Sequence, residues 1–315
     1  MESSNQTKVN ILITGINGFV GEHLAKQIKA SGYSVFGVGR ETAPAPNVSS
    51  FIDQYLSCDL MKAEETEKID LSNTAAIIHL AGLASVRDSF NNPELYINSN
   101  ANITGNILST AEKQKMLGRI VVVSTGALYD PSQPMPLTET SSVAESSPYA
   151  IGKMKAEKVA KDYIKSGLNV VIARPFNHVG AHQRTGFLVP DLYEQLRDAA
   201  NRGEDKILVG NLDTRRDYTD VRDIAKAYIK LIEAETLHHD TYNICSGESI
   251  SGLEVLNAIK DSMGLSDIST VIDPSRVRPT DAPDVVGSPS RIREDTGWEP
   301  ESTALTAIKD FVTEQ

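Results

Sequence analysis

Tyr149 and Lys153 are residues whose types and spacing could carry out proton transfer. They stand four positions apart, which places a phenol and an ammonium group on one face of a helix that Pro148 can begin. A tyrosine has an ordinary pKa of about 10, and a nearby cation favours the phenolate, which brings the pKa toward the working range. Ser124 and Thr125, at the end of the preceding predicted strand, add two hydroxyl groups. The set predicts proton exchange with a substrate oxygen.

A glycine-rich turn opens the chain's first helical segment. Three glycines spaced three and three follow an apolar, β-rich run over residues 9–14, and helical spacing begins at Phe19. Backbone N–H groups and the helix N-terminus can then approach a pyrophosphate closely. We therefore expect a dinucleotide to bind here, through Gly15, Asn17, Gly18, Phe19, Val20 and Gly21.

The ends of the next predicted strands supply further cofactor residues. Arg40 stands after the second strand, where a carboxylate would mark an NAD enzyme, and an arginine there suits the 2′-phosphate of NADP. NAD stays possible, because Arg40 could also face solvent. Asp59, after the third strand, is a candidate partner for the adenine amino group. After the fourth strand, small residues that follow His79 let the backbone pass close to the cofactor. His79 itself is expected to pack at the strand end. The remaining candidates are Leu60, Leu80, Ala81 and Gly82.

Apolar runs alternate with helical segments through the first half of the chain. Runs over 33–38, 75–80, 119–124 and 168–173 predict a parallel, doubly wound sheet of the Rossmann type, within an α/β fold. After Arg174-Pro175 the predicted elements become shorter. They are a helix over 221–234, a strand over 242–246, and a helix from 251 followed by a loop through 289. In the first half of the chain, residues 41–50 resemble a linker. We expect an NADP-binding domain of residues 1–176 and 216–248, and a smaller, discontinuous substrate-binding domain of residues 177–215 and 249–315.

Composition excludes several classes of protein. The net charge is −11 and the basic residues are scattered, which argues against a nucleic-acid surface, so an anionic substrate must be held by a few placed arginines. The two cysteines, Cys58 and Cys245, are expected to be small buried hydrophobes, and we expect no metal site. No apolar leader or run of membrane-spanning length is found, so we expect no membrane partner and a cytoplasmic location.

The chain resembles an extended short-chain dehydrogenase/reductase of the sugar-nucleotide branch. The resemblance rests on the glycine-rich turn, the residues at the strand ends, the Ser124, Thr125, Tyr149 and Lys153 set, and the run Arg174-Pro175-Phe176-Asn177, and it covers nearly the whole chain. It implies that Thr125 and Tyr149 bond the sugar oxygen that undergoes the redox change. Lys153 would tune Tyr149 and hold the nicotinamide ribose, and the nicotinamide would stack over the sugar.

Within that branch, residues 174–180, 186–190 and 210–217 most resemble GDP-mannose 4,6-dehydratases and GDP-4-keto-6-deoxymannose reductases, and residues 278–281 and 297–300 fit the same group. The resemblance implies a GDP-sugar substrate and a homodimer. The interface would use the helices near 100–113 and from Tyr149, with apolar positions only partly needed for the monomer core: Ile103, Ile107, Leu108, Ile151, Met154 and Val159. The implied substrate residues are Ser124, Asn177 at the diphosphate-sugar, Val189 at the guanine, and Arg216 and Arg278 at the pyrophosphate.

The segment after Thr125 separates the possible reactions. Dehydratases of this branch carry Thr-x-Glu, which is Thr125-Gly126-Ala127 here, and Ala127 cannot move a proton. We therefore predict NADPH-dependent reduction of the C4 ketone of a GDP-4-keto-6-deoxyhexose. A further candidate is an enzyme of the fucose-synthase type, an epimerase and reductase that uses a cysteine and a histidine. Here Ala127 occupies the cysteine position. His182 falls near the histidine position, but a histidine in this loop could simply face solvent. The sequence also leaves open a nucleotide-sugar 4-epimerase, a GDP-mannose 4,6-dehydratase with a base from elsewhere, and a non-enzymatic NADP-binding regulator.

Overall fold

The computed structural model of the chain describes residues 9–277 and 282–315. The chain divides into two compact units: the first comprises residues 1–128, 145–174 and 225–242, and the second comprises residues 129–144, 175–224 and 243–315. One predicted substrate residue, Arg278, lies outside the described residues.

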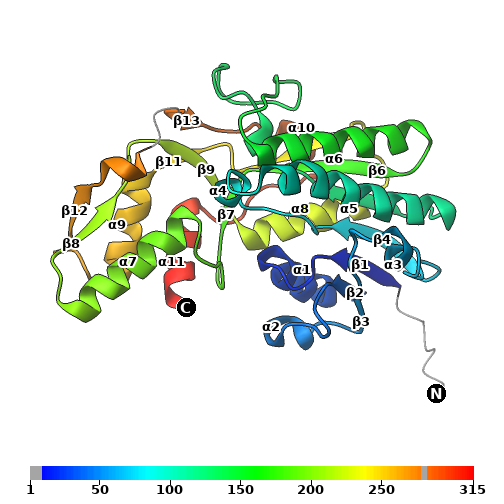
Figure 1. The fold of residues 1–315 in the computed structure, drawn as a ribbon, viewed down its shortest axis with the longest axis horizontal. Coiled ribbons are helices and arrows are strands. Elements are labelled where there is room, and N and C mark those ends of the chain that lie inside the picture. The colour runs from blue at the N-terminus through cyan, green and yellow to red at the C-terminus, as the bar shows by residue number, and fades with distance from the viewer. Residues whose placement is uncertain (1–8, 278–281) are drawn as a thin grey trace. The chain divides into compact units, whose positions relative to one another are not determined.

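A seven-stranded sheet organises the first unit (Figure 1). The strands run in the order β10-β6-β5-β4-β1-β2-β3, and those from β6 to β3 are parallel. Because the chain builds outward from β1 in one direction and then from β4 in the other, the sheet is doubly wound, as predicted. The strands are β1 Asn10–Thr14, β2 Ser34–Gly39, β3 Gln54–Ser57, β4 Thr74–His79, β5 Arg119–Val123, β6 Val170–Pro175 and β10 Thr241–Ile244.

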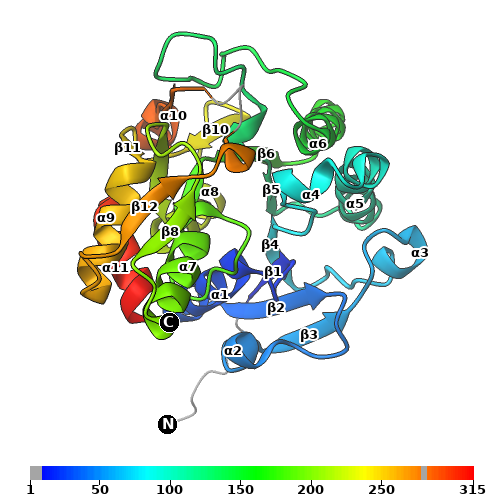
Figure 2. The same cartoon turned by 60° about the vertical axis from the view of Figure 1, so that its left-hand side comes forward.

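Helices cover both faces of this sheet. In Figure 2, α5 and α6 lie side by side on one face, and α1 and α8 lie on the other. Leu12, Ile77, Ile107 and Ile172 are fully buried in the apolar cluster of the α5–α6 face. The helices are α1 Phe19–Ala30, α2 Pro46–Ser49, α3 Ala63–Thr66, α4 Val86–Ser89, α5 Pro93–Lys113, α6 Pro148–Lys165 and α8 Val221–Glu233, with the 3₁₀ turn η1 at Gly126–Leu128.

Among its described residues, the second unit contains a small sheet, a two-stranded ribbon and four helices. The sheet joins β7 Asn177–Val179, β9 Arg215–Asp220, β11 Ser249–Ser251 and β13 Asp284–Val285, and the ribbon joins β8 Lys206–Val209 to β12 Ser269–Ile272. The helices are α7 Leu188–Arg202, α9 Gly252–Met263, α10 Ser290–Thr296 and α11 Ala304–Thr313, with the turn η2 at Pro274–Arg276. Their shared core includes Val179, Leu196, Ile259 and Phe311.

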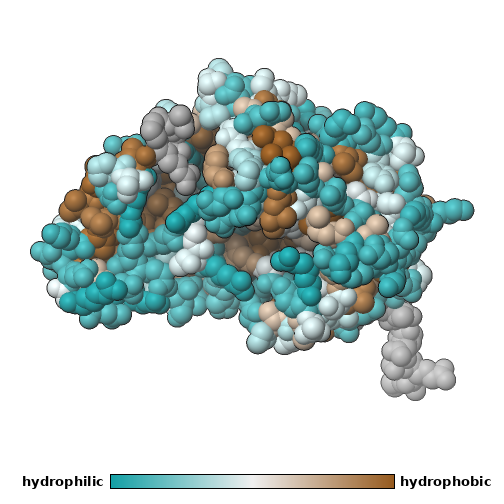
Figure 3. Space-filling view, viewed as in Figure 1, coloured by the Kyte–Doolittle hydropathy of each residue, from teal (hydrophilic) through white to brown (hydrophobic). Residues whose placement is uncertain are grey.

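Apolar side chains remain exposed on the β8–β12 ribbon. Leu208, Val271 and Ile272 are 45%, 44% and 65% exposed. The space-filling view shows brown atoms where Figure 1 places these two strands (Figure 3). Among the described residues, no helix combines the length and the apolar character that a membrane span requires.

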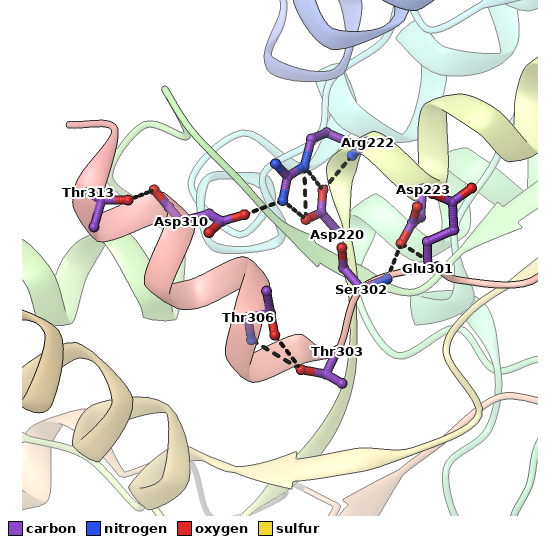
Figure 4. Close-up of polar contacts among 9 residues, drawn as sticks. All are labelled: Asp220, Arg222, Asp223, Glu301, Ser302, Thr303, Thr306, Asp310 and Thr313. Atoms are coloured by element: carbon purple, nitrogen blue, oxygen red, sulfur yellow. Dashed lines mark hydrogen bonds and ion pairs between the residues drawn. The ribbon is translucent and has the colours of Figure 1, made fainter.

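Buried carboxylates fasten the C-terminal segment of the second unit to the start of α8 (Figure 4). Asp223 is 1% exposed, and its Oδ2 accepts hydrogen bonds from the backbone N–H groups of Glu301 and Ser302, both at 2.9 Å. Arg222 bridges Asp220 and Asp310 through its guanidinium group. The carboxylates therefore hold the residues that lead into α11, as well as the helix itself.

Candidate active site

The glycine-rich turn between β1 and α1 has the shape that a dinucleotide requires. Gly15 has φ of +68°, and a Cβ there would lie 2.9 Å from the backbone nitrogen of Ala81. A Cβ at Gly21 would collide with the carbonyl oxygen of Ile16. Gly18 is the N-cap residue of α1 and offers no side chain of its own to cap the helix. The positive end of the helix dipole favours an anionic ligand there, and the residues fit a bound pyrophosphate.

An acidic residue that sequence reasoning missed stands after β2. Asn17 donates from Nδ2 to Glu41 Oε2 at 2.8 Å and accepts at Oδ1 from the backbone N–H of Ala45 at 2.9 Å. The hydrogen bond from Asn17 holds the pKa of Glu41 below its usual value. Arg40 is exposed beside it. The sequence shows Glu41 directly after Arg40. Both charges therefore stand at the end of β2, where the adenosine ribose is expected to bind.

The other predicted cofactor residues follow β3 and β4 or begin α1. Asp59 is half-buried, and its Oδ1 accepts from the backbone N–H of Met61 at 3.1 Å. Ala81 donates its backbone N–H to Thr14 Oγ1 at 3.1 Å, which fixes the start of the loop after β4. Phe19, Val20, Leu60, Leu80 and Gly82 complete the set. All of them belong to the first unit, and those after β3 and β4 lie at the carboxyl ends of parallel strands, as predicted.

His79 is packed inside the first unit. Its Nδ1 lies 2.8 Å from Thr14 Oγ1, and its Nε2 lies 3.3 Å from Thr104 Oγ1. Burial, with a smaller contribution from Lys153, lowers the pKa of His79 to about 3. The ring is therefore neutral at physiological pH, which agrees with the prediction of a strand-end histidine that packs rather than catalyses.

The predicted catalytic residues lie on α6 and just after β5. Ser147 caps the helix by accepting from the backbone N–H of Ala150 at 3.1 Å, and Tyr149 and Lys153 follow on the buried face. Lys153 Nζ donates to the carbonyl oxygen of Val123 at 2.8 Å. Burial lowers the pKa of Lys153 to about 8, against the opposing effect of Glu157.

Burial dominates the acidity of Tyr149. It raises the pKa of this phenol, although a hydrogen bond with the Thr125 side chain acts in the opposite direction. The net direction is opposite to the one expected from the Tyr149/Lys153 spacing, because the loss of solvation in a side chain that is 7% exposed outweighs the hydrogen bond with Thr125. The phenol keeps its proton at neutral pH and is therefore suited to donate it.

The residues around Thr125 are in place for a substrate oxygen. Thr125 Oγ1 accepts from the backbone N–H of Ala127 at 3.1 Å. Ser124 donates its backbone N–H to Ala173 at 2.7 Å, while its Oγ makes no hydrogen bond within the described part of the chain. A buried hydroxyl without a partner is costly, which favours a ligand as the missing partner of Ser124.

The predicted substrate residues of the second unit occupy different environments. Asn177 is exposed in β7. Val189 is 1% exposed and packs into the core of the unit, so its side chain serves packing. Arg216 is half-buried in β9 and donates from Nη1 to the carbonyl oxygens of Arg215 and Ala282, at 2.7 and 2.9 Å. His182 is exposed with φ of +64°, as expected for a histidine that faces solvent. The substrate roles of these residues stay predictions.

A sequence profile of the family described as "NAD dependent epimerase/dehydratase family" matches residues 11–245, which is most of the chain. The chain belongs to this family. The GDP-6-deoxy-D-mannose reductase of Pseudomonas aeruginosa is 28% identical over 311 residues, covering 96% of each chain. A UDP-glucose 4-epimerase of Pisum sativum is 29% identical and covers 91% of this chain and 90% of its own.

A solved structure of similar fold is RMD from Pseudomonas aeruginosa complexed with NADPH. It matches with a TM-score of 0.83 and 26% identity, and 98% of each chain is covered. The predictions of an extended short-chain dehydrogenase/reductase, a Rossmann-type fold and an NAD(P)-dependent enzyme acting on nucleotide sugars are therefore confirmed at the level of the family.

Proposed function

We propose that this member of the epimerase/dehydratase family reduces the C4 ketone of a GDP-4-keto-6-deoxyhexose with NADPH. The observation that carries the proposal is the residue set after β5: Thr125 and Tyr149 are present, but Ala127 stands where dehydratases of the resembled branch have a glutamate. An elimination needs a base for the C5 proton, whereas ketone reduction needs only a hydride and a proton. The similarity to the GDP-6-deoxy-D-mannose reductase supports the same choice.

Each residue has a defined part in this reduction. The bound nicotinamide coenzyme supplies the hydride to C4. Tyr149 donates its proton to the C4 oxygen, and its raised pKa keeps that proton available. Thr125 bonds the same oxygen, and Lys153 orients the nicotinamide ribose. We expect the GDP moiety to bind through residues of the second unit, namely Asn177, Arg216, Arg278 and, because the Val189 side chain is buried in the core, the backbone at and near Val189.

Two incubations followed by mass spectrometry test the proposal. With the 4-keto-6-deoxy sugar nucleotide, we expect one NADPH oxidised for each ketone reduced. With GDP-mannose and NADP⁺, we expect binding without reaction, because no base reaches C5. Loss of water from GDP-mannose with catalytic NADP⁺ would establish a dehydratase instead, and some other residue would then have to act as the base. A protein that consumes no NADPH with the ketone would contradict the reductase.

A 4-epimerase is the second candidate, favoured by the similarity to the UDP-glucose 4-epimerase of Pisum sativum. An epimerase would use the same Tyr149 to oxidise and then reduce C4, and would keep its coenzyme through turnover. The test is to incubate the purified protein with UDP-glucose without added coenzyme and to separate the products by chromatography. Formation of UDP-galactose under these conditions would replace the reductase proposal, and its absence would remove a UDP-glucose 4-epimerase as a candidate.

A further inference from the structure

A buried ion pair lies one helical turn beyond Lys153, and the proposed reaction assigns it no role. Arg174, in β6, donates from Nε to Glu157 Oε1 at 2.8 Å and from Nη2 to Oε2 at 2.6 Å. Both residues are 4% exposed. Removing two charges from water is costly, and apolar side chains of similar size would often serve stability as well. The position of the pair in the fold therefore needs a reason other than packing.

The pair continues the row of buried groups that begins with Tyr149 and Lys153. Glu157 is four residues after Lys153 on the same buried face of α6, so the carboxylate follows the ammonium group by one turn. Lys153 reaches β5 at Val123, and Glu157 reaches the neighbouring strand β6 at Arg174. The two contacts are adjacent, because Val123 pairs with Ala173, the residue before Arg174.

We propose that Glu157 is a positioning residue that keeps Lys153 protonated and oriented toward the coenzyme ribose, and that Arg174 fixes the Glu157 carboxylate in place. A buried ammonium group is disfavoured by the loss of water, and a fixed carboxylate one turn away restores part of the lost stabilisation. The bidentate geometry of Arg174 gives the carboxylate a single orientation. This inference rests on the coenzyme site of the proposed function and not on the choice of sugar.

The other groups around Lys153 cannot supply the same negative charge. His79, on β4, is neutral because burial lowers its pKa to about 3. Tyr149, on α6, keeps its proton because burial raises its pKa. From α5 comes the neutral amide of Asn100, beside Gly82. Glu157 is the group that acts against burial on the pKa of Lys153.

The test is the pH dependence of NADP⁺ binding, measured by calorimetry without any sugar. In the native enzyme, affinity should fall as the pH rises through about 8, where Lys153 loses its proton. In Glu157→Gln, the midpoint should move to lower pH by about one unit, because the opposite charge is lost. Glu157→Gln alone leaves the Arg174 charge buried without its carboxylate, which can unfold the protein. The double variant Glu157→Gln/Arg174→Gln removes both charges and avoids this problem.

Two further comparisons make the outcome decisive. Asp162→Asn removes an exposed carboxylate from the same helix, whose ion pairs with Lys158 and Lys165 lie at the surface, and should leave the midpoint unchanged. The double variant should fold, as judged by its melting temperature, and its midpoint should also move to lower pH, by less than in Glu157→Gln because the Arg174 cation is lost as well. A folded double variant that titrates as the native enzyme does would mean that the pair serves structure alone and would overturn the proposal. Because binding is measured without sugar, failure of the reductase proposal leaves this test intact.

Discussion

Tyr149 and Lys153 illustrate what residue types and spacing convey at the scale of single side chains. Their four-residue separation predicts one helix face, and both residues lie on the buried face of α6. Their ionisation could not be inferred in the same way. Burial raises the pKa of Tyr149 and lowers that of Lys153, and burial depends on elements far away in the chain.

The Tyr149→Phe variant tests the role of the phenol. It removes only the hydroxyl, so the packing of α6 should survive and the coenzyme should still bind. Turnover should fall by about 10²- to 10⁴-fold, the usual contribution of a positioned proton donor. Steady-state kinetics beside NADP⁺ calorimetry separates the two effects. Near-native turnover in this variant would exclude Tyr149 as the acid.

Arg40 and Glu41 together should decide the choice between NADPH and NADH. We expect the native enzyme to prefer NADPH, because Arg40 can pair with the 2′-phosphate. Arg40→Ala should raise the KM for NADPH by about tenfold, the order expected for one charge-assisted hydrogen bond, and should leave the KM for NADH nearly unchanged. Glu41→Gln should strengthen the preference for NADPH over NADH, because it removes the carboxylate beside Asn17. Equal efficiency with both coenzymes in the native enzyme would contradict this prediction.

At the scale of elements, strong local patterns were predicted well and short strands were not. The predicted strand over 75–80 is β4 Thr74–His79, and the predicted helix over 221–234 is α8 Val221–Glu233. The predicted loop through 289, however, contains β12 and β13, and the linker-like stretch 41–50 contains α2. β12 exists because it pairs with β8, more than fifty residues earlier, and all of its residues are exposed. A strand of this kind carries no alternation that a sequence could reveal.

The attachment of the C-terminal segment gives a prediction at this scale. Asp223→Ala removes the acceptor for the backbone N–H groups of Glu301 and Ser302. Leaving these donors without partners should lower the free energy of unfolding by about 2 to 4 kcal/mol. Thr303→Ala, which removes the N-cap of α11, should cost only about 1 kcal/mol. Denaturant unfolding measures both, and equal losses would show that Asp223 acts as no more than a cap.

At the scale of the whole molecule, the monomer core corrects part of the expected dimer interface. Ile107 and Leu108 are fully buried within the core cluster of the first unit, so they serve the monomer. Ile103 and Val159 are partly buried against the same cluster. Ile151 and Met154 are half-buried on α6. The apolar surface that remains on the two helices is therefore smaller than the sequence indicated.

We still predict a homodimer formed through α5 and α6, in agreement with the family resemblance. Met154→Glu places a charge at a half-buried position of α6 and should convert the dimer to a monomer at micromolar concentration. Sedimentation velocity measures the change, and Lys158→Glu at an exposed position of the same helix is the matched control. A native protein that sediments as a monomer would contradict the dimer.

The sequence by itself determined the features that a few neighbouring residues encode. The turn with a left-handed Gly15, the helix that starts at Pro148 and the order of strands and helices each follow from local spacing and backbone geometry. These signals predict the Rossmann-type sheet, and the structure places the predicted catalytic pair and the glycine-rich turn in the same unit.

Only the tertiary structure decided which distant charges meet and how deeply they are buried. Glu157 and Arg174 are separated by 17 residues, and Asn17 and Glu41 by 24, so no local pattern predicts either contact. Burial of Tyr149 and Lys153 likewise depends on the packing of α6 against the sheet. The pKa of a side chain reflects solvation and nearby charge in three dimensions, and both arise from contacts between elements that the sequence presents separately.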